Sequence, residues 1–220
     1  MRIEHAVALV TGANRGLGLA LTDRLVERGA RVYAGVRDPS SGTRPGVVPV
    51  RLDITEPAAV AAAARRCRDV NLLINNAAIA GGGPLLGADA EPRARAEMET
   101  NYFGTLAMCR AFAPQLAGGA LVNVLSILSF VSPPGFGSTA ASKAAAWSMT
   151  RTVRHELRAQ GTLVVGVHAS FIDTRLAGGV DAPKHRPQDV ADLVLDAVEA
   201  GQEEVLADER TRVMKATLPG

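Results

Sequence analysis

The segment LVNVLSILSFVSPPGFGSTAASK, residues 121–143, sets out the plan of this chain. It begins as an apolar run typical of a buried strand, reaches Ser126, crosses a loop rich in Ser, Pro and Gly, and continues as an Ala-rich helix that carries Lys143. A hydroxyl and an ammonium group are therefore expected at one end of a sheet, supplied by two different elements. Thr139 lies one helical turn before Lys143, where an acidic hydroxyl would be most useful.

Strand and helix alternate in this way about six times along the chain. Strands are predicted at Ala6–Val10, Arg31–Val36, Val47–Leu52, Asn71–Ile74, Ala120–Leu125 and Thr162–His168, with a possible short strand at Glu204–Ala207. Helices are predicted at Leu17–Val26, Pro57–Arg68 with Thr55 as N-cap, Ala94–Leu116, Ser138–Ala159, Gln188–Ala200 and Glu209–Ala216, and residues 38–46 are predicted as a loop. The alternation indicates an α/β fold: a Rossmann-like, doubly wound parallel sheet in three αβα layers, forming a single domain over residues 1–220.

Composition narrows the classes of protein to consider. Of the 220 residues, 47% are hydrophobic and 21% charged, which is ordinary for a globular protein. A net charge of +2 with scattered arginines argues against nucleic-acid binding, and no apolar stretch approaches the roughly 20 residues of a membrane span. Cys67 and Cys109 lack CxxC spacing, so we expect two free buried thiols and no metal site. Without a secretory signal, a cytoplasmic location is expected.

Doubly wound sheets bind ligands at the carboxyl ends of their strands. Candidate functional residues should therefore follow strands directly, and the residues in such positions are Gly12, Arg37, Asp53, Asn75, Ser126 and Ala169.

The glycine segment 12–18, GANRGLG, joins the first strand to the first helix. Glycines permit a tight turn and a close approach of the backbone to a pyrophosphate, which the helix N-terminus would hold. The spacing is GxxxGxG, and a turn that merely needs positive φ is the competing interpretation. Arg37 at the end of the second strand and Arg15 in the turn favour the 2′-phosphate of NADP, although Asp38 leaves NAD open.

Together these motifs resemble the short-chain dehydrogenase/reductase family over nearly the whole chain. The matching segments are the glycine turn, Asp53 after the third strand, Asn75-Asn76-Ala77-Ala78, Asn101 in Asn-Tyr-Phe-Gly, Ser126, Ala-Ser-Lys143 and Thr174. The resemblance implies NADP(H) as cofactor and a catalytic group of Ser126, Thr139, Lys143 and Asn101. It implies cofactor contacts at Gly12, Asn14, Arg15, Gly16, Leu17, Gly18, Arg37, Asp53, Ile54, Asn75, Ala77, Lys143 and Thr174.

In that family a tyrosine gives a proton to the carbonyl oxygen of the substrate while hydride leaves the nicotinamide. The lysine lowers the pKa of the tyrosine and holds the ribose. The serine polarises the carbonyl group, and the asparagine holds a water molecule. Here Thr139 occupies the tyrosine position, and neither Tyr33 nor Tyr102 can be brought into register. An aliphatic hydroxyl is a much weaker acid than a phenol and stops several ångströms short, so proton delivery is expected to be weakened or rearranged.

Several functions remain open from these residues. The first is NADPH-dependent reduction of a carbonyl or activated alkene, favoured because Asn101, Ser126 and Lys143 are all present. The alternatives are a non-redox lyase, isomerase or cyclase, a binding protein that senses NADP(H), and an ordinary reductase in which tyrosine was replaced by threonine.

Substrate and partners are less well defined by the sequence. Phe130, Val131, Phe136 and Leu176 suggest an apolar pocket for a small molecule. The family resemblance implies that two long helices pair between subunits, and Ala-rich faces at Ala140–Ala146 and Leu106–Phe112 would suit such pairing, so a homodimer or homotetramer is expected.

Overall fold

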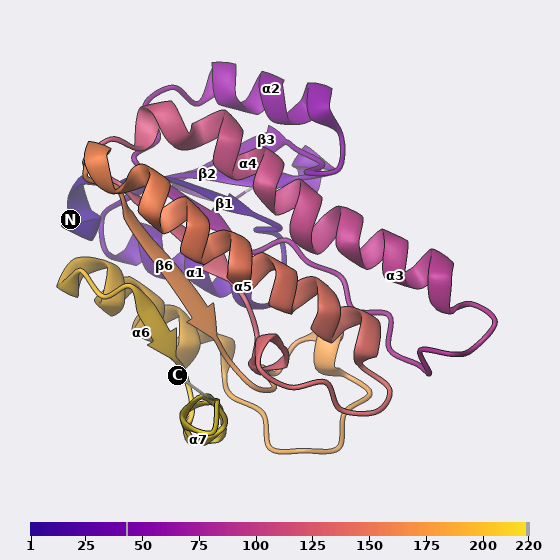
Figure 1. Cartoon of the computed structure of the whole chain (residues 1–220). Coiled ribbons are helices and arrows are strands. Elements are labelled where there is room, and N and C mark those ends of the chain that lie inside the picture. Colours follow the sequence, from indigo (N-terminus) through magenta and orange to yellow (C-terminus); the bar gives the residue numbers. More distant parts are fainter. Residues whose placement is uncertain (43, 219–220) are drawn as a thin grey trace.

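The computed structural model describes residues 1–42 and 44–218 and contains one parallel sheet of seven strands (Figure 1). The strand order is β3-β2-β1-β4-β5-β6-β7. The strands are β1 (Val7–Thr11), β2 (Arg31–Val36), β3 (Val47–Arg51), β4 (Leu72–Asn75), β5 (Ala120–Val124), β6 (Leu163–His168) and β7 (Glu204–Leu206). The order reverses between β1 and β4, and the predicted doubly wound α/β fold is confirmed.

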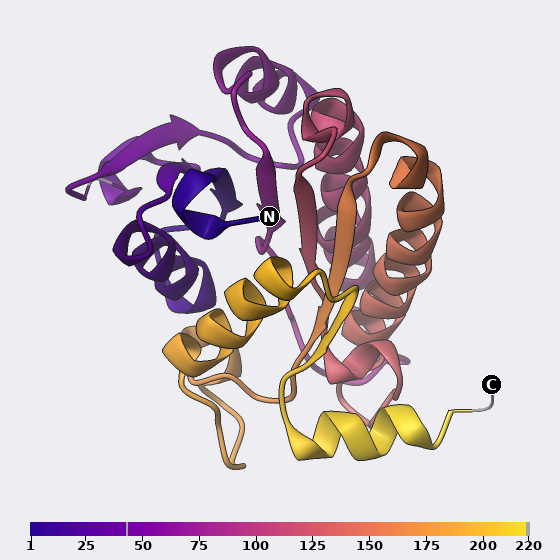
Figure 2. The same ribbon diagram turned by 90° about the vertical axis from the view of Figure 1, so that its left-hand side faces the viewer.

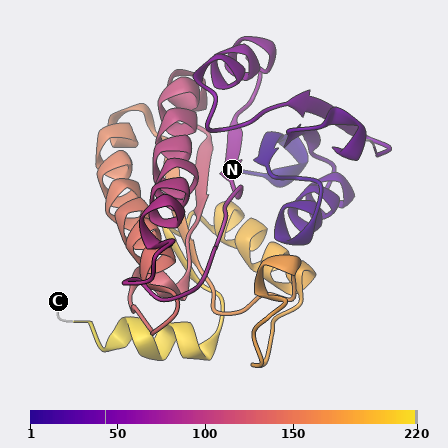
Figure 3. The ribbon, with the colours of Figure 1, turned by 90° about the vertical axis from the view of Figure 1, so that its right-hand side faces the viewer.

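Helices cover both faces of the sheet. Their bounds are α1 (Gly16–Glu27), α2 (Pro57–Arg66), α3 (Ala90–Met98), α4 (Thr105–Phe112), α5 (Gly137–Leu157), α6 (Pro187–Ala200) and α7 (Glu209–Ala216). Figure 2 shows α1 and α6 on one side of the sheet and α4 and α5 on the other. Figure 3 shows the same layers from the opposite side, with α7 in yellow crossing below the strands. No helix among the described residues has the length and apolar character needed to cross a bilayer.

Side chains on the two faces of the strands belong to two separate apolar clusters. Ala8 and Val10 of β1 enter the cluster under α1 and α6, whereas Leu9 between them enters the cluster under α2, α4 and α5. Leu72, Leu73 and Ile74 of β4 divide between the two clusters in the same way. Because successive strand residues point to opposite faces and both faces are covered, every position of these strands favours an apolar residue.

Three local predictions need correction. Thr55 is not the N-cap of α2: Glu56 holds that position, and the Thr55 hydroxyl donates instead to Asp53 Oδ1 over 2.7 Å. The predicted loop 38–46 contains a 3₁₀ turn, η2 (Pro39–Gly42), while Thr43 lies outside the described residues. The predicted helix 94–116 is a succession of α3, a π-helical turn η3 (Glu99–Gly104), α4 and a 3₁₀ turn η4 (Ala113–Leu116).

His168 ends β6 and is fully buried beside the half-buried rings of Phe130 and Trp147. Its Nδ1 lies 3.1 Å from the carbonyl oxygen of Ser126, and its ring stacks on Phe130 at a centroid distance of 4.3 Å. Nε2 has no hydrogen-bond partner among the residues described, although Glu204 Oε1 lies 3.7 Å away. Burial lowers the pKa of His168 to about 4, so the folded protein holds a neutral imidazole here.

This burial makes the folded state sensitive to mild acid. The unfolded chain takes up a proton at His168 near pH 6.5, whereas the folded chain does so only near pH 4, so stability falls as pH drops between these values. We expect the free energy of unfolding to decrease by about 2 kcal/mol between pH 7 and pH 5 from this group. Urea unfolding at both pH values should show a clearly smaller difference in His168→Gln. An equal difference in the variant would contradict the assignment.

Candidate functional site

The glycine turn between β1 and α1 needs glycine at three positions. Gly12 and Gly16 have φ of +66° and +54°, in the left-handed region. A Cβ at Gly18 would collide with the carbonyl oxygen of Gly12 and with the side chain of Asn76. Asn76, directly after β4, donates from Nδ2 to the carbonyl oxygen of Thr11 over 2.9 Å. Its side chain therefore packs against the backbone that leads into the turn.

The same turn presents an open helix N-terminus. Arg15 is the N-cap of α1 and makes no side-chain capping bond, and the first turn contains no acidic residue. The first backbone N–H groups of a helix have no intrahelical acceptor and favour an anion. Asn14 and Arg15 are exposed here, while Leu17 is buried beneath them. The cradle therefore fits the pyrophosphate of a dinucleotide.

Asp38, which left the choice between NAD and NADP open, is hydrogen-bonded within its own turn. Its Oδ1 accepts hydrogen bonds from the N–H and the hydroxyl of Ser40, over 3.0 and 2.8 Å. The next residue, Ser41, accepts a hydrogen bond from Asn14 Nδ2 over 3.1 Å, which ties this turn to the glycine turn. Arg37 is exposed beside them.

Asp53 follows β3 at the same edge of the sheet. Burial alone would raise its pKa, but hydrogen bonds from the Thr55 N–H and hydroxyl and the charge of Arg37 outweigh burial, so the pKa is lowered and Asp53 is ionised. Ile54 beside it is buried against Gly104. The charge of Arg37 therefore acts on Asp53, and the ends of β2 and β3 form one polar region.

Three further expected contacts have different outcomes. Thr174 lies against the glycine turn, since a Cβ at Gly16 would meet the Thr174 Cγ2 at 3.0 Å. Asn75, by contrast, turns its amide into the interior, where Nδ2 donates to Asn123 Oδ1 over 2.9 Å. Ala77 directs its N–H to the hydroxyl of Thr11 over 3.0 Å. Asn76, which we did not single out as a contact residue, also touches the turn, because its Nδ2 would lie 3.2 Å from a Cβ at Gly12.

Ser126 and Lys143 lie at the end of β5. Ser126 caps a short 3₁₀ turn, η5 (Ile127–Ser129), and its Oγ accepts a hydrogen bond from Leu128 N–H over 3.1 Å. Lys143 Nζ donates to the carbonyl oxygen of Val124 over 2.9 Å, which brings the ammonium to the strand that leads into Ser126. Burial lowers the pKa of Lys143 to about 8.

The Thr139 hydroxyl has a partner that the sequence did not reveal. It donates to Oε1 of Glu97 over 2.8 Å, and both residues are buried. Glu97 lies one helical turn before Asn101, and this spacing is the feature of the sequence that could have indicated a place for Glu97 near the site. That the acid would be buried could not be predicted, because Glu is almost never fully buried unless it is paired.

Side chains on one face of α3 and η3 form hydrogen bonds with the loop that follows β4. Arg93 donates to the carbonyl oxygen of Pro84 over 2.8 Å, Glu97 accepts from Gly81 N–H, and Asn101 both donates to and accepts from the Ile79 backbone. The second N–H of Asn101 donates to Ser142 Oγ over 2.9 Å. Both amide hydrogens of Asn101 are therefore used by the protein itself.

The apolar residues proposed for the substrate pocket are only partly available. Phe130 packs on His168 and edge-on against Trp147, at a centroid distance of 4.9 Å. Leu176 is exposed, whereas Val131 and Phe136 are half-buried. In the part of the chain that the structure describes, no group of three or more His, Cys, Asp or Glu side chains could hold a metal ion.

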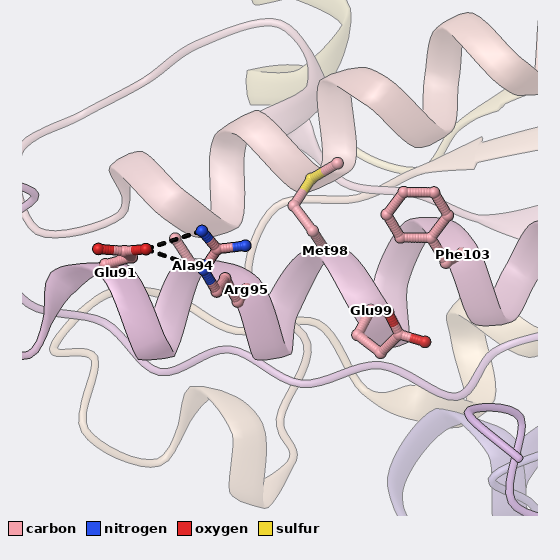
Figure 4. A pocket seen from close by; sticks show the side chains of 6 residues that line it. All are labelled: Glu91, Ala94, Arg95, Met98, Glu99 and Phe103. Atoms are coloured by element: carbon pink, nitrogen blue, oxygen red, sulfur yellow. Dashed lines mark hydrogen bonds and ion pairs between the residues drawn. The ribbon is translucent and has the colours of Figure 1, made fainter.

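Two shallow surface depressions lie away from this edge. Figure 4 shows the first, on the outer side of α3, lined by Glu91, Ala94, Arg95, Met98, Glu99 and Phe103. The second lies where η3 and α4 meet α5, between Tyr102 and Leu106 on one side and Ala145 and Met149 on the other. Neither includes a candidate catalytic residue.

Known proteins resemble this chain over most of its length. The family described as short chain dehydrogenase matches residues 6–185. A short chain dehydrogenase from Burkholderia cenocepacia, solved in complex with NADP, is 48% identical, with a TM-score of 0.93 over 98% of this chain and 94% of that one. The 1-deoxy-11-beta-hydroxypentalenate dehydrogenase of Streptomyces avermitilis is 32% identical, covering 90% of this chain and 81% of its own.

A short chain dehydrogenase/reductase from Burkholderia phymatum, solved in complex with NAD, has a TM-score of 0.87 over 98% of this chain and 93% of that one, and at 24% identity it shows the shared fold alone. The family match over more than half of the chain agrees with the glycine turn, the strand order and the Ser126–Lys143 arrangement. The chain is a member of the short-chain dehydrogenase/reductase family, and it is an oxidoreductase of that type.

Proposed function

We propose that this protein is an NADPH-dependent reductase that acts on a carbonyl, or an activated alkene, of a small apolar substrate, with proton delivery rearranged around Thr139. The observation that supports this best is the common location of the glycine turn, Thr174, Ser126 and Lys143 at one edge of the sheet. When bound, the nicotinamide cofactor would supply a hydride, and the residues of the chain would bind, orient and protonate the substrate.

The residues present fit such a cofactor. The glycine turn leaves no space for a Cβ at Gly18, and the N-terminus of α1 is free of acidic side chains. Asp53 would meet the adenosine end, Lys143 the ribose and Thr174 the nicotinamide amide. The full proposed set of contacts is Gly12, Asn14, Arg15, Gly16, Leu17, Gly18, Arg37, Asp53, Ile54, Asn75, Ala77, Lys143 and Thr174, with Asn75 contributing through its backbone.

The phosphorylated cofactor is favoured because Asp38 is occupied elsewhere. An acidic residue at the end of the second strand would hold the ribose hydroxyls of NAD, but both hydrogen bonds of Asp38 Oδ1 come from Ser40. Arg37 and Arg15 are exposed and can hold a 2′-phosphate by paired hydrogen bonds. The Burkholderia cenocepacia relative contains NADP, in agreement with this choice.

Replacing Arg37 with alanine should reduce NADPH affinity by about 10–100-fold and leave NADH affinity within about twofold, since a charge-assisted bond to the phosphate contributes about 1.5–3 kcal/mol. Nucleotide fluorescence titration measures both affinities. Arg31→Ala, at the opposite end of the same strand, is the matched control and should bind NADPH as the wild type does. Equal losses for NADPH and NADH in Arg37→Ala would contradict the preference for NADP.

Within the catalytic group, Ser126 would polarise the carbonyl and Lys143 would supply positive charge. Lys143 and Thr139 are four residues apart on one face of α5. Thr139 lacks the phenol that would extend its reach, and its hydroxyl points to Glu97. Slow turnover is therefore expected for ordinary ketones, because general-acid help is worth about 10²–10⁴ in rate.

Replacing Thr139 with tyrosine should raise kcat for simple ketones by about 10²-fold or more, since a phenol beside Lys143 is a competent acid within reach. NADPH oxidation against a panel of carbonyl compounds measures the change, with Thr139→Phe as the control that adds the ring without the hydroxyl. Tight NADPH binding without turnover by either the wild type or Thr139→Tyr would refute the proposed reductase.

We also propose that the protein is a homodimer or homotetramer that pairs through α4 and α5. Phe103 is 50% exposed, and the depression between Tyr102, Leu106, Ala145 and Met149 leaves an apolar helical surface without a partner within the described chain. A cytoplasmic location remains part of the proposal and agrees with the free thiols at Cys67 and Cys109.

Sedimentation should give a mass of two or four chains for the wild type. Ala145→Arg, which places a long cation in the depression, should shift the mass toward one chain. Leu193→Asp on α6 is the control, since that residue is exposed on the opposite side of the sheet and should leave the mass unchanged. A monomeric wild type at micromolar concentration would count against the pairing.

A further inference from the structure

Glu97 is a carboxyl group inside the candidate site for which the family resemblance provides no role. Its side chain is 0% exposed, and Oε1 accepts hydrogen bonds from Gly81 N–H and from the Thr139 hydroxyl. Oε2 has no hydrogen-bond partner among the residues that the structure describes. A buried polar atom without a partner is uncommon in folded proteins and often marks a chemical role.

The hydroxyl of Thr139 has a single proton, and that proton faces Glu97 Oε1 over 2.8 Å. In this arrangement the hydroxyl offers only lone pairs to any other group, so it cannot protonate a carbonyl oxygen. Turning the proton outward leaves the Thr139 oxygen facing the Glu97 oxygen. That contact is favourable only if Glu97 supplies the hydrogen, so Thr139 can act as an acid only when Glu97 is protonated.

We propose that Glu97 and Thr139 form a two-residue proton relay in place of the missing phenol, an inference that rests on the proposed reductase function. Hydride adds to the carbonyl carbon, the π electron pair of the C=O bond moves to oxygen, and that oxygen takes the Thr139 hydroxyl proton. The Thr139 oxygen takes the carboxyl proton of Glu97 as it loses its own. An alcohol, an oxidised cofactor and a Glu97 carboxylate result, and a solvent proton returns through Thr139 after product release.

The relay removes the difficulty that a threonine poses by itself. An isolated threonine would have to leave as an alkoxide, which is far less stable than the phenolate of tyrosine. In the relay no alkoxide forms, because the Thr139 oxygen gains the Glu97 proton as it gives up its own. The substrate oxygen would enter the space that a tyrosine ring at position 139 would fill.

The surroundings hold the pair in place. The Gly81 N–H fixes the carboxyl group from the loop side, and Asn101, one turn later on the same face, donates to Ser142 Oγ. Thr139 and Ser142 lie three residues apart on the facing side of α5, so α5 is joined to α3 through Glu97 and to η3 through Asn101. Such positioning is what efficient proton transfer requires.

The test uses isosteric variants of the intact protein with NADPH and the best substrate of the carbonyl panel. Glu97→Gln can accept the Gly81 hydrogen bond through its amide oxygen but cannot transfer a proton, and Thr139→Val removes the hydroxyl at constant shape. Each should lower kcat by about 10²-fold or more with little change in KM. Thr139→Ser should stay within about tenfold of the wild type.

A double variant separates a relay from two independent structural roles. In Glu97→Gln/Thr139→Val the loss should be no greater than in Thr139→Val alone, because the carboxyl group acts only through the hydroxyl. NADPH affinity without substrate, measured by fluorescence, should stay close to that of the wild type in all variants, which shows that the folded cofactor site is retained. In the Thr139→Tyr background, Glu97→Gln should have little effect.

Wild-type kcat in Glu97→Gln, or losses that multiply in the double variant, would overturn the relay and leave the reductase function intact. Turnover confined to Thr139→Tyr would do the same. If neither the wild type nor Thr139→Tyr oxidises NADPH with any carbonyl compound, the proposed function fails and the relay fails with it.

Discussion

Seven parallel strands oblige the chain to return to the same edge of the sheet after every crossover, and the candidate site depends on that constraint. Each strand ends near its neighbours, so residues far apart in sequence gather without any direct coupling between their segments. Gly12 after β1, Asp53 after β3, Ser126 after β5 and Thr174 after β6 all reach this edge. Burial of both faces of the sheet stabilises the arrangement and leaves only the loops free to vary.

The family resemblance aligns Thr139 with the catalytic tyrosine, and the contacts around this residue suit a threonine. Thr139 is buried and bonded to Glu97, which is itself held by the loop after β4. The Thr139 hydroxyl joins a carboxyl group, and α3, α5 and the loop after β4 meet at that contact.

At the proposed cofactor end, two neighbouring side chains carry opposite charges. Asp38 and Arg37 are neighbours in sequence, and either could face a ribose. Asp38 is held by Ser40, whereas Arg37 is exposed and acts electrostatically on Asp53. The proposed preference for NADP rests on this difference between the two side chains.

The sequence by itself determined the fold and the edge of the sheet at which the candidate residues lie, because strand periodicity and glycine chemistry are local properties. Only the tertiary structure decided where side chains point. The Asn75 side chain points inward, and Asn76 contacts the glycine turn instead. Phe130 stacks on His168, and Glu97 accepts a hydrogen bond from Thr139. These outcomes depend on packing between elements distant in sequence, and no spacing along one segment encodes which polar atom a neighbouring helix will meet.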